Sequence, residues 1–501
     1  MNIELISESL ISIGCDTLVI GHFEGETISG KAIEGLDNAL AGQISALLRD
    51  QPNCVKYGKT TVIYTFNQIA AKSVILLGLG KKKEVTNDKL RALSAIALRM
   101  ARQLRPMTVA AIIYDDSNKT LDTVAAAQAI VEGVILGSYQ FSCYKSDKEN
   151  FDPIQKVLMI QNDTPAETKL SREDLQKSLI IGQSVNFARD LVNHPANYMT
   201  PSRMVEEASH LAKQYSMELT VLELQDMEKL HMHALLAVAQ GSEEPPKLLV
   251  LKHMGDVTSN EIIAFVGKGV TFDSGGISLK PSEGMQEMKD DMAGGAAVLG
   301  AMAAIAQLKP AVNIIGIIPC TENMPSGKAL KPGDIITSMA KKTIEIINTD
   351  AEGRLILADG VTYARYLGAT KIIDIATLTG ACVVALGAII SGVLTNNDDW
   401  CQQVLEAADQ TGEKMWKFPN HEDYYEQIKS TIADVKNSGG RPAGAITAGL
   451  FIAQFADNIP WVHIDIAGTV NSEKDKGYNS MGATGIGVRT LIRLAENLQK
   501  R

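Results

Sequence analysis

Segments with the apolar pattern of β-strands alternate with segments of helical periodicity along most of this 501-residue chain. In the first 160 residues, strand-like runs at 16–23, 60–66, 73–79, 107–114 and 151–160 interleave with helical spacing at 87–104 and 120–136. Helical crossovers join parallel strands, so this alternation predicts an α/β unit with a largely parallel sheet. The same residues contain no cluster of metal-ligand or catalytic side chains.

The rest of the chain predicts a second unit of the same class. A polar, turn-rich stretch at 162–174 indicates the boundary, and strand-like runs return at 219–222, 247–253, 262–266, 312–319, 371–376 and 461–466. We expect an N-terminal α/β domain at 1–165, a linker helix within 166–195 and a second domain at 196–501. The predicted fold class is α/β, with two domains that each hold a mixed or mostly parallel sheet flanked by helices.

Composition limits the environment and the partners. The net charge of −10 argues against nucleic acid as the main partner. Six widely spaced cysteines without a CxxC pair indicate free thiols in a reducing compartment. The N-terminal residues MNIELISESLISIG lack the basic region of a signal peptide. We therefore expect a cytoplasmic protein.

One uncharged stretch, residues 375–394, has the length of a membrane span. It contains several Thr, Ser and Gly residues, and it continues from the strand-like run KIIDIA at 371–376. A buried strand leading into a loop of small residues explains this pattern better than a membrane helix. We expect no membrane partner.

The most informative motif is NTDAEGRL at 348–355. It places Asp350, Glu352 and Arg354 at alternate positions between a short β-rich run and a helical segment, where functional side chains are often presented. Alone, an acidic turn with an arginine is more often a solvated loop. Two further stretches, VGKGVTFDSGGISLKP (266–281) and KDDMAGG (289–295), add Lys268, Asp273, Lys280 and Asp291. The combined set predicts a two-metal hydrolytic site.

Each of these residues also has an ordinary interpretation. A lysine between two glycines, such as Lys268, is normally exposed, and as a ligand it would have to lose a proton of pKa about 10.4. Asp291 is expected to begin a small-residue helix, whose dipole favours an anion there. Its neighbour Asp290 is expected to be a solvated acid. A local acidic turn explains any one of them, but five candidate ligands in two glycine-flanked blocks are harder to dismiss.

The motifs together resemble the cytosolic leucyl aminopeptidases, a family of di-metal exopeptidases, in their bacterial form. The stretches ARDLVNHPANYMTP (188–201) and NSGGRPAGAITAGLF (437–451) resemble the same family, so that the resemblance runs from about residue 186 to the C-terminus. It implies the release of N-terminal residues, preferentially leucine or similar, from peptides with a free N-terminus by metal-activated water. It also implies a homohexamer and a macro-like first domain.

The resemblance further implies roles for individual residues. One metal ion, zinc or manganese, would be held by Lys268, Asp273, Asp291 and Glu352, and a second by Asp273, Glu352 and the side chain and carbonyl of Asp350. Lys280 would polarise the scissile carbonyl, and Arg354 would hold a bicarbonate ion as general base. Met288, Thr377 and Gly380 match positions that line the pocket for the first side chain.

Two other functions stay open from the residues alone. A carboxylate-rich metal pair also suits a phosphoesterase, although the amine ligand and the lack of further basic residues count against it. The first domain could instead bind nucleic acid, as a secondary role. Hydrolysis of a chromogenic leucine amide with and without a chelator would separate these interpretations.

Overall fold

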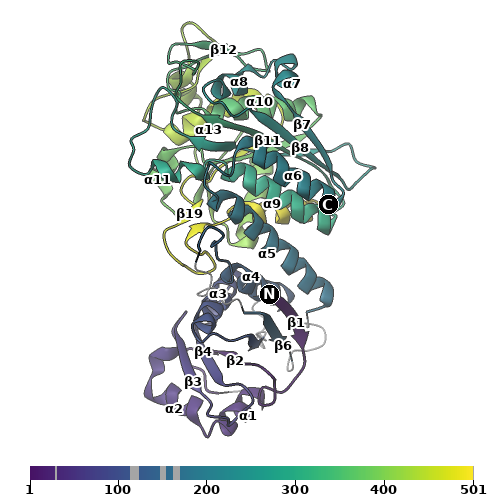
Figure 1. Cartoon of the computed structure of the whole chain (residues 1–501), viewed down its shortest axis with the longest axis vertical. Coiled ribbons are helices and arrows are strands. Elements are labelled where there is room, and N and C mark those ends of the chain that lie inside the picture. Colours follow the sequence, from purple (N-terminus) through teal and green to yellow (C-terminus); the bar gives the residue numbers. More distant parts are fainter. Residues whose placement is uncertain (29–30, 113–122, 147–153, 162–169, 500–501) are drawn as a thin grey trace. The chain divides into compact units, whose positions relative to one another are not determined.

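The computed structural model describes residues 1–28, 31–112, 123–146, 154–161 and 170–499 (Figure 1). The chain divides into a first unit, Met1–Gln183 with Lys474–Ser480, and a second unit, Ser184–Glu473 with Met481–Arg501. Both units combine sheets with helices, which confirms the predicted α/β class. Part of the expected boundary, residues 162–169, lies outside the described residues. Helix α5 (Arg172–Asn193) begins in the first unit and ends in the second.

The first unit is built on a six-stranded sheet with the strand order β1-β6-β5-β2-β4-β3. Its pairs are parallel except for β3 with β4. The strands are β1 (Asn2–Ile6), β2 (Thr17–Phe23), β3 (Thr60–Tyr64), β4 (Ser73–Gly80), β5 (Thr108–Ile112) and β6 (Lys156–Ile160). The helical elements are α1 (Lys31–Ala39), α2 (Gln43–Asp50), η1 (Pro52–Val55), η2 (Lys82–Glu84), α3 (Asn87–Gln103) and α4 (Thr123–Gly137).

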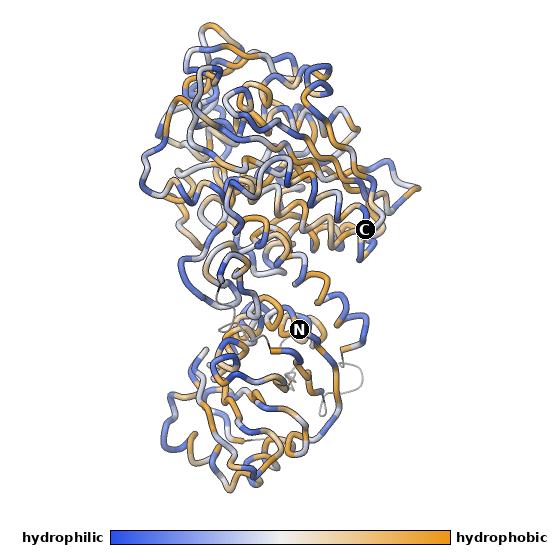
Figure 2. The backbone as a smooth tube through the Cα atoms, viewed as in Figure 1, coloured by the Kyte–Doolittle hydropathy of each residue, from blue (hydrophilic) through white to orange (hydrophobic). Residues whose placement is uncertain are grey.

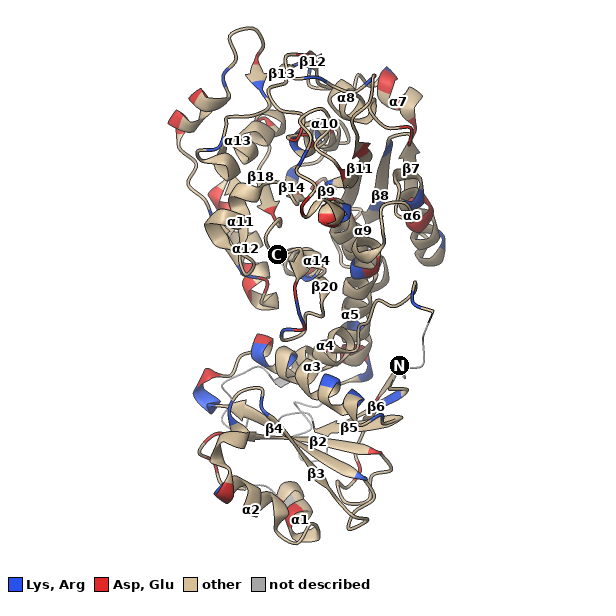
Figure 3. Cartoon of the chain, turned by 60° about the vertical axis from the view of Figure 1, so that its left-hand side comes forward, with Lys and Arg blue, Asp and Glu red and all other residues tan. Residues whose placement is uncertain are grey.

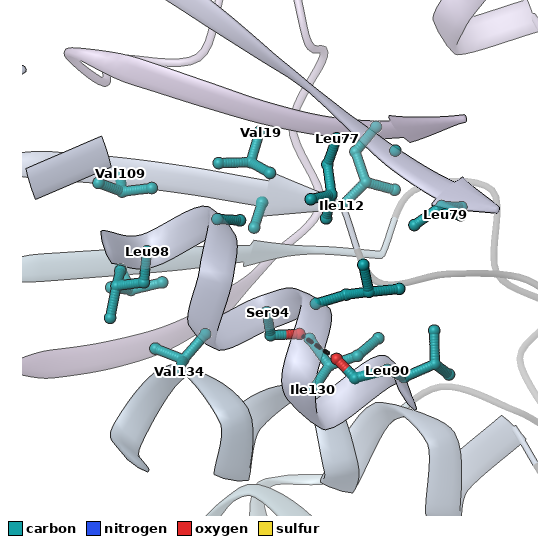
Figure 4. A pocket seen from close by; sticks show the side chains of 15 residues that line it. Val19, Leu77, Leu79, Leu90, Ser94, Leu98, Val109, Ile112, Ile130 and Val134 are labelled. Carbon is teal, nitrogen blue, oxygen red and sulfur yellow. Dashed lines mark hydrogen bonds between the residues drawn. The ribbon is translucent and has the colours of Figure 1, made fainter. Parts of the chain in front are cut away.

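Alternation along the strands divides the core of this unit in two. Val19 of β2 packs with α3 and α4, whereas its neighbours Leu18 and Ile20 pack with α1 and α2 on the other face. On the α3–α4 face a cavity of about 40 Å³ is lined by apolar side chains (Figure 4). The hydroxyl of Ser94, which also lines it, donates to Leu90 O at 2.9 Å within its own helix. The cavity is therefore a packing void rather than a polar binding site.

The second unit is built on a nine-stranded mixed sheet. Its strand order is β16-β15-β18-β14-β9-β11-β8-β7, and β10 pairs with β11. The strands are β7 (Glu218–Leu222), β8 (Lys247–Met254), β9 (Ile263–Gly267), β10 (Gly269–Asp273), β11 (Asn313–Asn323), β14 (Lys371–Ala376), β15 (Ser391–Thr395), β16 (Met415–Lys417) and β18 (Trp461–Asp465). Strands β9, β10, β11, β14 and β18 all run in the same direction.

Helices cover both faces of this sheet, α9, α14 and α6 on one and α8, α10 and α13 on the other. The helical elements are α6 (Pro201–Tyr215), α7 (Leu224–Lys229), α8 (His233–Ala239), η4 (Met285–Asp290), α9 (Ala293–Leu308), α10 (Gly353–Tyr366), α11 (Gly380–Leu386), α12 (Asp398–Thr411), η5 (Glu422–Ile428), α13 (Gly444–Ala456) and α14 (Val488–Gln499). Two small sheets complete the unit: β12 (Ile335–Thr337), β13 (Thr343–Glu345) and β17 (Val435–Lys436), and β19 (Asn471–Ser472) with β20 (Gly482–Ala483).

Helix α9 packs closely against the sheet because its first turns carry glycines. A Cβ atom on Gly294 would lie 2.0 Å from Ile375 O, and one on Gly267 would lie 2.5 Å from Gly294 O. This approach brings the start of α9 to the carboxyl ends of β9 and β14. Because parallel strands end at the same edge of a sheet, the loops that follow β9, β10, β11 and β14 meet there.

Apolar segments are concentrated in the interiors of both units (Figure 2). Within the described residues, the helical stretch Met285–Leu308 has the length and hydropathy of a membrane span, but 89% of its most apolar window is buried inside the protein. That burial is typical of a core helix. The uncharged stretch 375–394 is divided between the end of β14, helix α11 and strand β15.

Candidate active site

The sheet edge of the second unit gathers the predicted site residues. Lys268 follows β9, Asp273 ends β10, and Asp291 follows η4 directly. Asp350 and Glu352 lie in the loop between β13 and α10, and Arg354 lies in the first turn of α10. Acidic and basic segments lie near one another around β9 and α10 (Figure 3). Residues up to 86 positions apart in the sequence thus form one cluster.

Two lysine ammonium groups lie between pairs of carboxylates in this cluster. Lys268 Nζ is 2.7 Å from Asp291 Oδ1 and 2.8 Å from Glu352 Oε1. The amine also donates to Thr377 O at 3.0 Å. Lys268 is only 2% exposed, so that the ordinary interpretation of an exposed strand-end lysine is wrong.

Lys280 forms the second, more accessible bridge. Its Nζ is 2.7 Å from Asp273 Oδ2 and 2.5 Å from Asp350 Oδ1, and 22% of its side chain is exposed. Asp273 also accepts hydrogen bonds at Oδ1 from Gly275 N, at 2.8 Å. The two lysines therefore contact different pairs of carboxylates in the cluster.

Crowding and burial shift the pKa values of several side chains in the cluster. Burial lowers the pKa of Lys268, but the charges of Asp291, Glu352 and Asp273 outweigh it, so that the pKa lies above its ordinary value. Burial and the charge of Glu352 raise the pKa of Asp273, against the opposing effect of Lys280. A further positive charge near these carboxylates, such as a proton or a metal ion, would therefore be stabilised.

The donor set fits divalent metal ions. One oxygen each from Asp273, Asp350 and Glu352 lie within 4.8 Å of one another. Asp291 Oδ2 and Glu352 Oε2 are buried and have no hydrogen-bond partner in the described part of the chain. Buried carboxylate oxygens are normally paired or coordinate a metal ion, and an oxygen-rich set suits Mn²⁺, Mg²⁺ or Zn²⁺. The amine of Lys268 completes the set when it has lost its proton, because ligation and deprotonation are coupled.

Arg354 lies under the same loop. It is 8% exposed and donates from Nη1 to Asn437 O at 2.7 Å. Burial lowers its pKa to about 10, although Glu352, Asp465 and Asp350 oppose the shift. Its Nε is buried without a hydrogen-bond partner among the described residues. The guanidinium is therefore charged, and one of its donors is unpaired within the described residues.

Of the residues predicted for the substrate pocket, Thr377 contacts this cluster directly. Thr377 follows β14 and donates from Oγ1 to Asp291 Oδ1 at 2.7 Å. Gly380 is exposed at the start of α11, and no atom lies within 4 Å of a Cβ built on it. Met288 lies half-buried in η4.

Two local expectations about the acidic pair are wrong. Asp291 does not begin α9, which starts two residues later, but caps the 3₁₀ helix η4. Asp290 is 7% exposed instead of solvated, and it accepts a hydrogen bond from Asn471 Nδ2. Burial, reinforced by Glu287, raises the pKa of Asp290 to about 7. The tight approach of α9 to the sheet explains both differences, because it draws this turn into the core.

The structure also shows site residues that the sequence interpretation did not select. Asn323, at the end of β11, donates to Asp273 Oδ1, and Asn437, after β17, accepts from and donates to the backbone of the 346–352 loop. Asn437 belongs to the stretch 437–451 that carries the family resemblance, but no role was assigned to it. For Asn323 the available signal was its place at the end of a buried parallel strand.

Comparisons with known proteins place the chain among similar proteins over most of its length. The catalytic domain of the cytosol aminopeptidase family matches residues 186–492, and the N-terminal domain of the same family matches residues 19–148. A probable cytosol aminopeptidase of Alkaliphilus metalliredigens is 45% identical over the full length of both chains. One of a Geobacter species is 42% identical over 98% of this chain and 99% of its own.

Solved structures show the same likeness. A mutant of tomato leucine aminopeptidase has a TM-score of 0.89 at 34% identity, over 99% of this chain and 96% of its own. The bottromycin maturation enzyme BotP, in complex with Mn, has a TM-score of 0.85 at 31% identity, over 97% of this chain and 99% of its own.

Proposed function

The chain belongs to the cytosol aminopeptidase family, and on this premise we propose that the carboxylate cluster of its second unit is the catalytic metal centre. The chain is a metal-dependent aminopeptidase, a hydrolase that acts on peptides and works with two divalent metal ions. The observation that supports the assignment of the centre is the convergence of Asp273, Asp350 and Glu352 within 4.8 Å beside a buried lysine.

We assign five residues to the two ions. Lys268, Asp273, Asp291 and Glu352 would hold one, and Asp273, Asp350 and Glu352 the other, so that two carboxylates bridge. Two divalent ions held there would lower the pKa of a water molecule and polarise the substrate carbonyl. The four carboxylates nearly neutralise the charge of such a pair.

Lys280 and Arg354 are proposed to act in the reaction without binding the metal ions. Burial lowers the pKa of Lys280, but Asp273, Glu352 and Asp350 together hold it above its ordinary value, so the ammonium is charged. Because it is also partly exposed, Lys280 can donate to the oxygen that gains negative charge when the peptide carbonyl is attacked. Arg354 would hold a bicarbonate ion as general base through its free Nε donor.

The substrate is a peptide with a free N-terminus. We propose that its α-amine distinguishes a chain end from an internal peptide bond, because the site offers a concentrated anionic donor set and no separate ammonium pocket was apparent in the sequence. Met288, Thr377 and Gly380 would surround the first side chain, which would be leucine or a similar residue, and Gly380 adds no side chain of its own there.

We also propose a metal identity, an assembly and a cellular location. The ions would be manganese or zinc, and the Mn complex of the structurally similar BotP supports manganese. The assembly would be a homohexamer, and the location the cytoplasm, as the names of the relatives suggest. The phosphoesterase and nucleic-acid-binding alternatives have no support from the comparisons.

A chromogenic leucine amide tests the proposed function. We expect release of the chromophore, its loss after treatment with a chelator, and its return on addition of Mn²⁺ or Zn²⁺. A chromogenic phosphate ester should stay intact under all three conditions. Chelator-resistant hydrolysis, or cleavage of the ester alone, would contradict the proposal.

A further inference from the structure

The loop that carries Asp350 and Glu352 is held on one side by a buried asparagine. Asn437, 0% exposed, accepts from Ile347 N at 2.8 Å and donates to Asn348 O at 2.7 Å. Its own carbonyl accepts from Arg354 Nη1 at 2.7 Å. One residue therefore fixes both the loop backbone and the guanidinium beside it.

A second buried asparagine holds the other side of the same loop. Asn323, 5% exposed, donates from Nδ2 to Thr349 O at 3.0 Å and to Asp273 Oδ1 at 2.8 Å. The backbone carbonyl of Asn323 accepts from Ser274 N and Ser274 Oγ, at 3.0 and 2.7 Å. The end of β11 thus joins the strand that carries Asp273 to the loop that carries Asp350.

Further contacts hold the segment after β10 tightly against the 346–352 loop. Thr349 Oγ1 donates to Gly275 O at 2.6 Å and accepts from Ser278 N at 2.8 Å. A Cβ atom on Gly276 would lie 2.7 Å from Asn323 Oδ1. The two ligand-bearing segments therefore meet at Asn323 without room for another side chain.

We propose that Asn323 and Asn437 are positioning residues that clamp the 346–352 loop, Asn323 setting the affinity of the cluster for divalent ions and Asn437 setting the position of Arg354. This proposal rests on the proposed metal centre. An amide suits the task because it donates and accepts hydrogen bonds without adding charge to a cluster of four carboxylates. With Oδ1 of Asp273 turned toward Asn323 and Gly275 N, Oδ2 is left facing the interior of the cluster. Outer-shell hydrogen bonds of this kind fix the orientation of metal ligands.

The chain offers a matched control on the same strand. Asn313 of β11 is 2% exposed, and its Nδ2 donates to the carbonyls of Asp256, Ser259 and Glu261 at the opposite end of the strand. Asn313→Leu and Asn323→Leu both remove buried amide hydrogen bonds from one strand. Only Asn323→Leu removes a bond to a proposed metal ligand.

Calorimetric titration of the metal-stripped full-length protein with Mn²⁺ tests the clamp. We expect Asn323→Leu to weaken binding by roughly 10–100-fold, as is typical when an outer-shell partner is removed, and Asn313→Leu to leave it unchanged. Asn323→Ser, which keeps a small donor, serves as a second variant in case the leucine variant does not fold, and it should show a smaller loss. Folded Asn323 variants with wild-type affinity would overturn the clamp, whereas a wild-type protein that binds no Mn²⁺ would overturn the metal centre itself.

The role of Asn437 is tested by kinetics on the metal-loaded protein. Asn437→Ala keeps the carbonyl that Arg354 contacts but removes the side-chain bonds that tie residue 437 to the loop. The carbonyl, and Arg354 with it, should then shift, so that kcat for a leucine amide falls while KM changes little. The same variant should lose less Mn²⁺ affinity than Asn323→Leu, since the Asn437 side chain bonds only the loop backbone, whereas Asn323 also bonds Asp273 Oδ1. A rise in KM at unchanged kcat would contradict this role.

Discussion

At the scale of single residues, the protonation of the site depends on the balance between its carboxylate and lysine charges. Four carboxylates and two lysines are packed at one sheet edge, and burial raises the pKa of Asp273, Asp291 and Asp350 against the opposing charges of the lysines. Carboxylates in such a site are stabilised by added positive charge. The division of labour that we propose follows from exposure: the buried Lys268 serves as a ligand, and the more accessible Lys280 contacts the substrate.

Glu352→Gln removes one charge that both metal ions would share. We expect both ions to bind more weakly, by more than the roughly 10–100-fold that loss of an outer-shell partner costs. Metal content of the purified variant, measured by plasma emission spectrometry, gives the answer. Glu345→Gln, the same change in β13 at a side chain that accepts from Ser430 Oγ, is the control. Two full equivalents of metal in Glu352→Gln at wild-type affinity would contradict the bridging role.

Lys280→Met removes the cationic donor but none of the proposed ligands. Turnover should fall by roughly 10²–10³, the loss typical of one oxyanion-stabilising donor, while the metal content stays complete. Steady-state kinetics and metal analysis on the same preparation separate the two effects. Lys331→Met, at an exposed lysine paired with Asp334, should leave both unchanged. Loss of a metal ion from the Lys280 variant would instead make Lys280 a ligand.

At the scale of secondary structure, the site depends on how closely α9 approaches the sheet. Strands and helices with clear periodicity were predicted to within a few residues, and β14 matches the predicted range completely. The environment of Asp290 and Asp291 could not be predicted, because it depends on long-range packing of Gly294 against β14. The clamp residues Asn323 and Asn437 were missed for the same reason, since their partners lie far away in the sequence.

Gly294→Ala tests this close approach. The new Cβ would lie 2.0 Å from Ile375 O, a backbone atom, so that helix or strand must move. We expect a loss of about 1–3 kcal/mol in the free energy of unfolding, as for an overpacked core. Chemical denaturation measures it. Gly327→Ala, at an exposed glycine with no atom within 4 Å of the new Cβ, should be neutral, and a neutral Gly294→Ala would show that the helix is not held there.

At the scale of the whole molecule, the sequence predicted more of the second unit than of the first. Three motifs contain the proposed ligands, and their order resembles one family over the second unit. The first unit has strands and helices at the expected places, but β1, α1 and α2 were not foreseen, and neither was the return of residues 474–480 to this unit. Short, weakly periodic segments of this kind are fixed by tertiary packing rather than by local pattern.

The most direct test of the central claim compares two peptides that differ only at the N-terminus. The full-length, metal-loaded protein should release leucine from a leucyl-peptide one residue at a time, with kcat/KM falling on the acid side as the substrate amine and the metal ligands become protonated. The N-acetyl-leucyl form of the same peptide should remain essentially intact, because acetylation removes the lone pair of the α-amine and adds bulk. Chromatography of the products over time measures both. Hydrolysis of the acetylated peptide at a comparable rate would contradict an aminopeptidase and identify a general amidase.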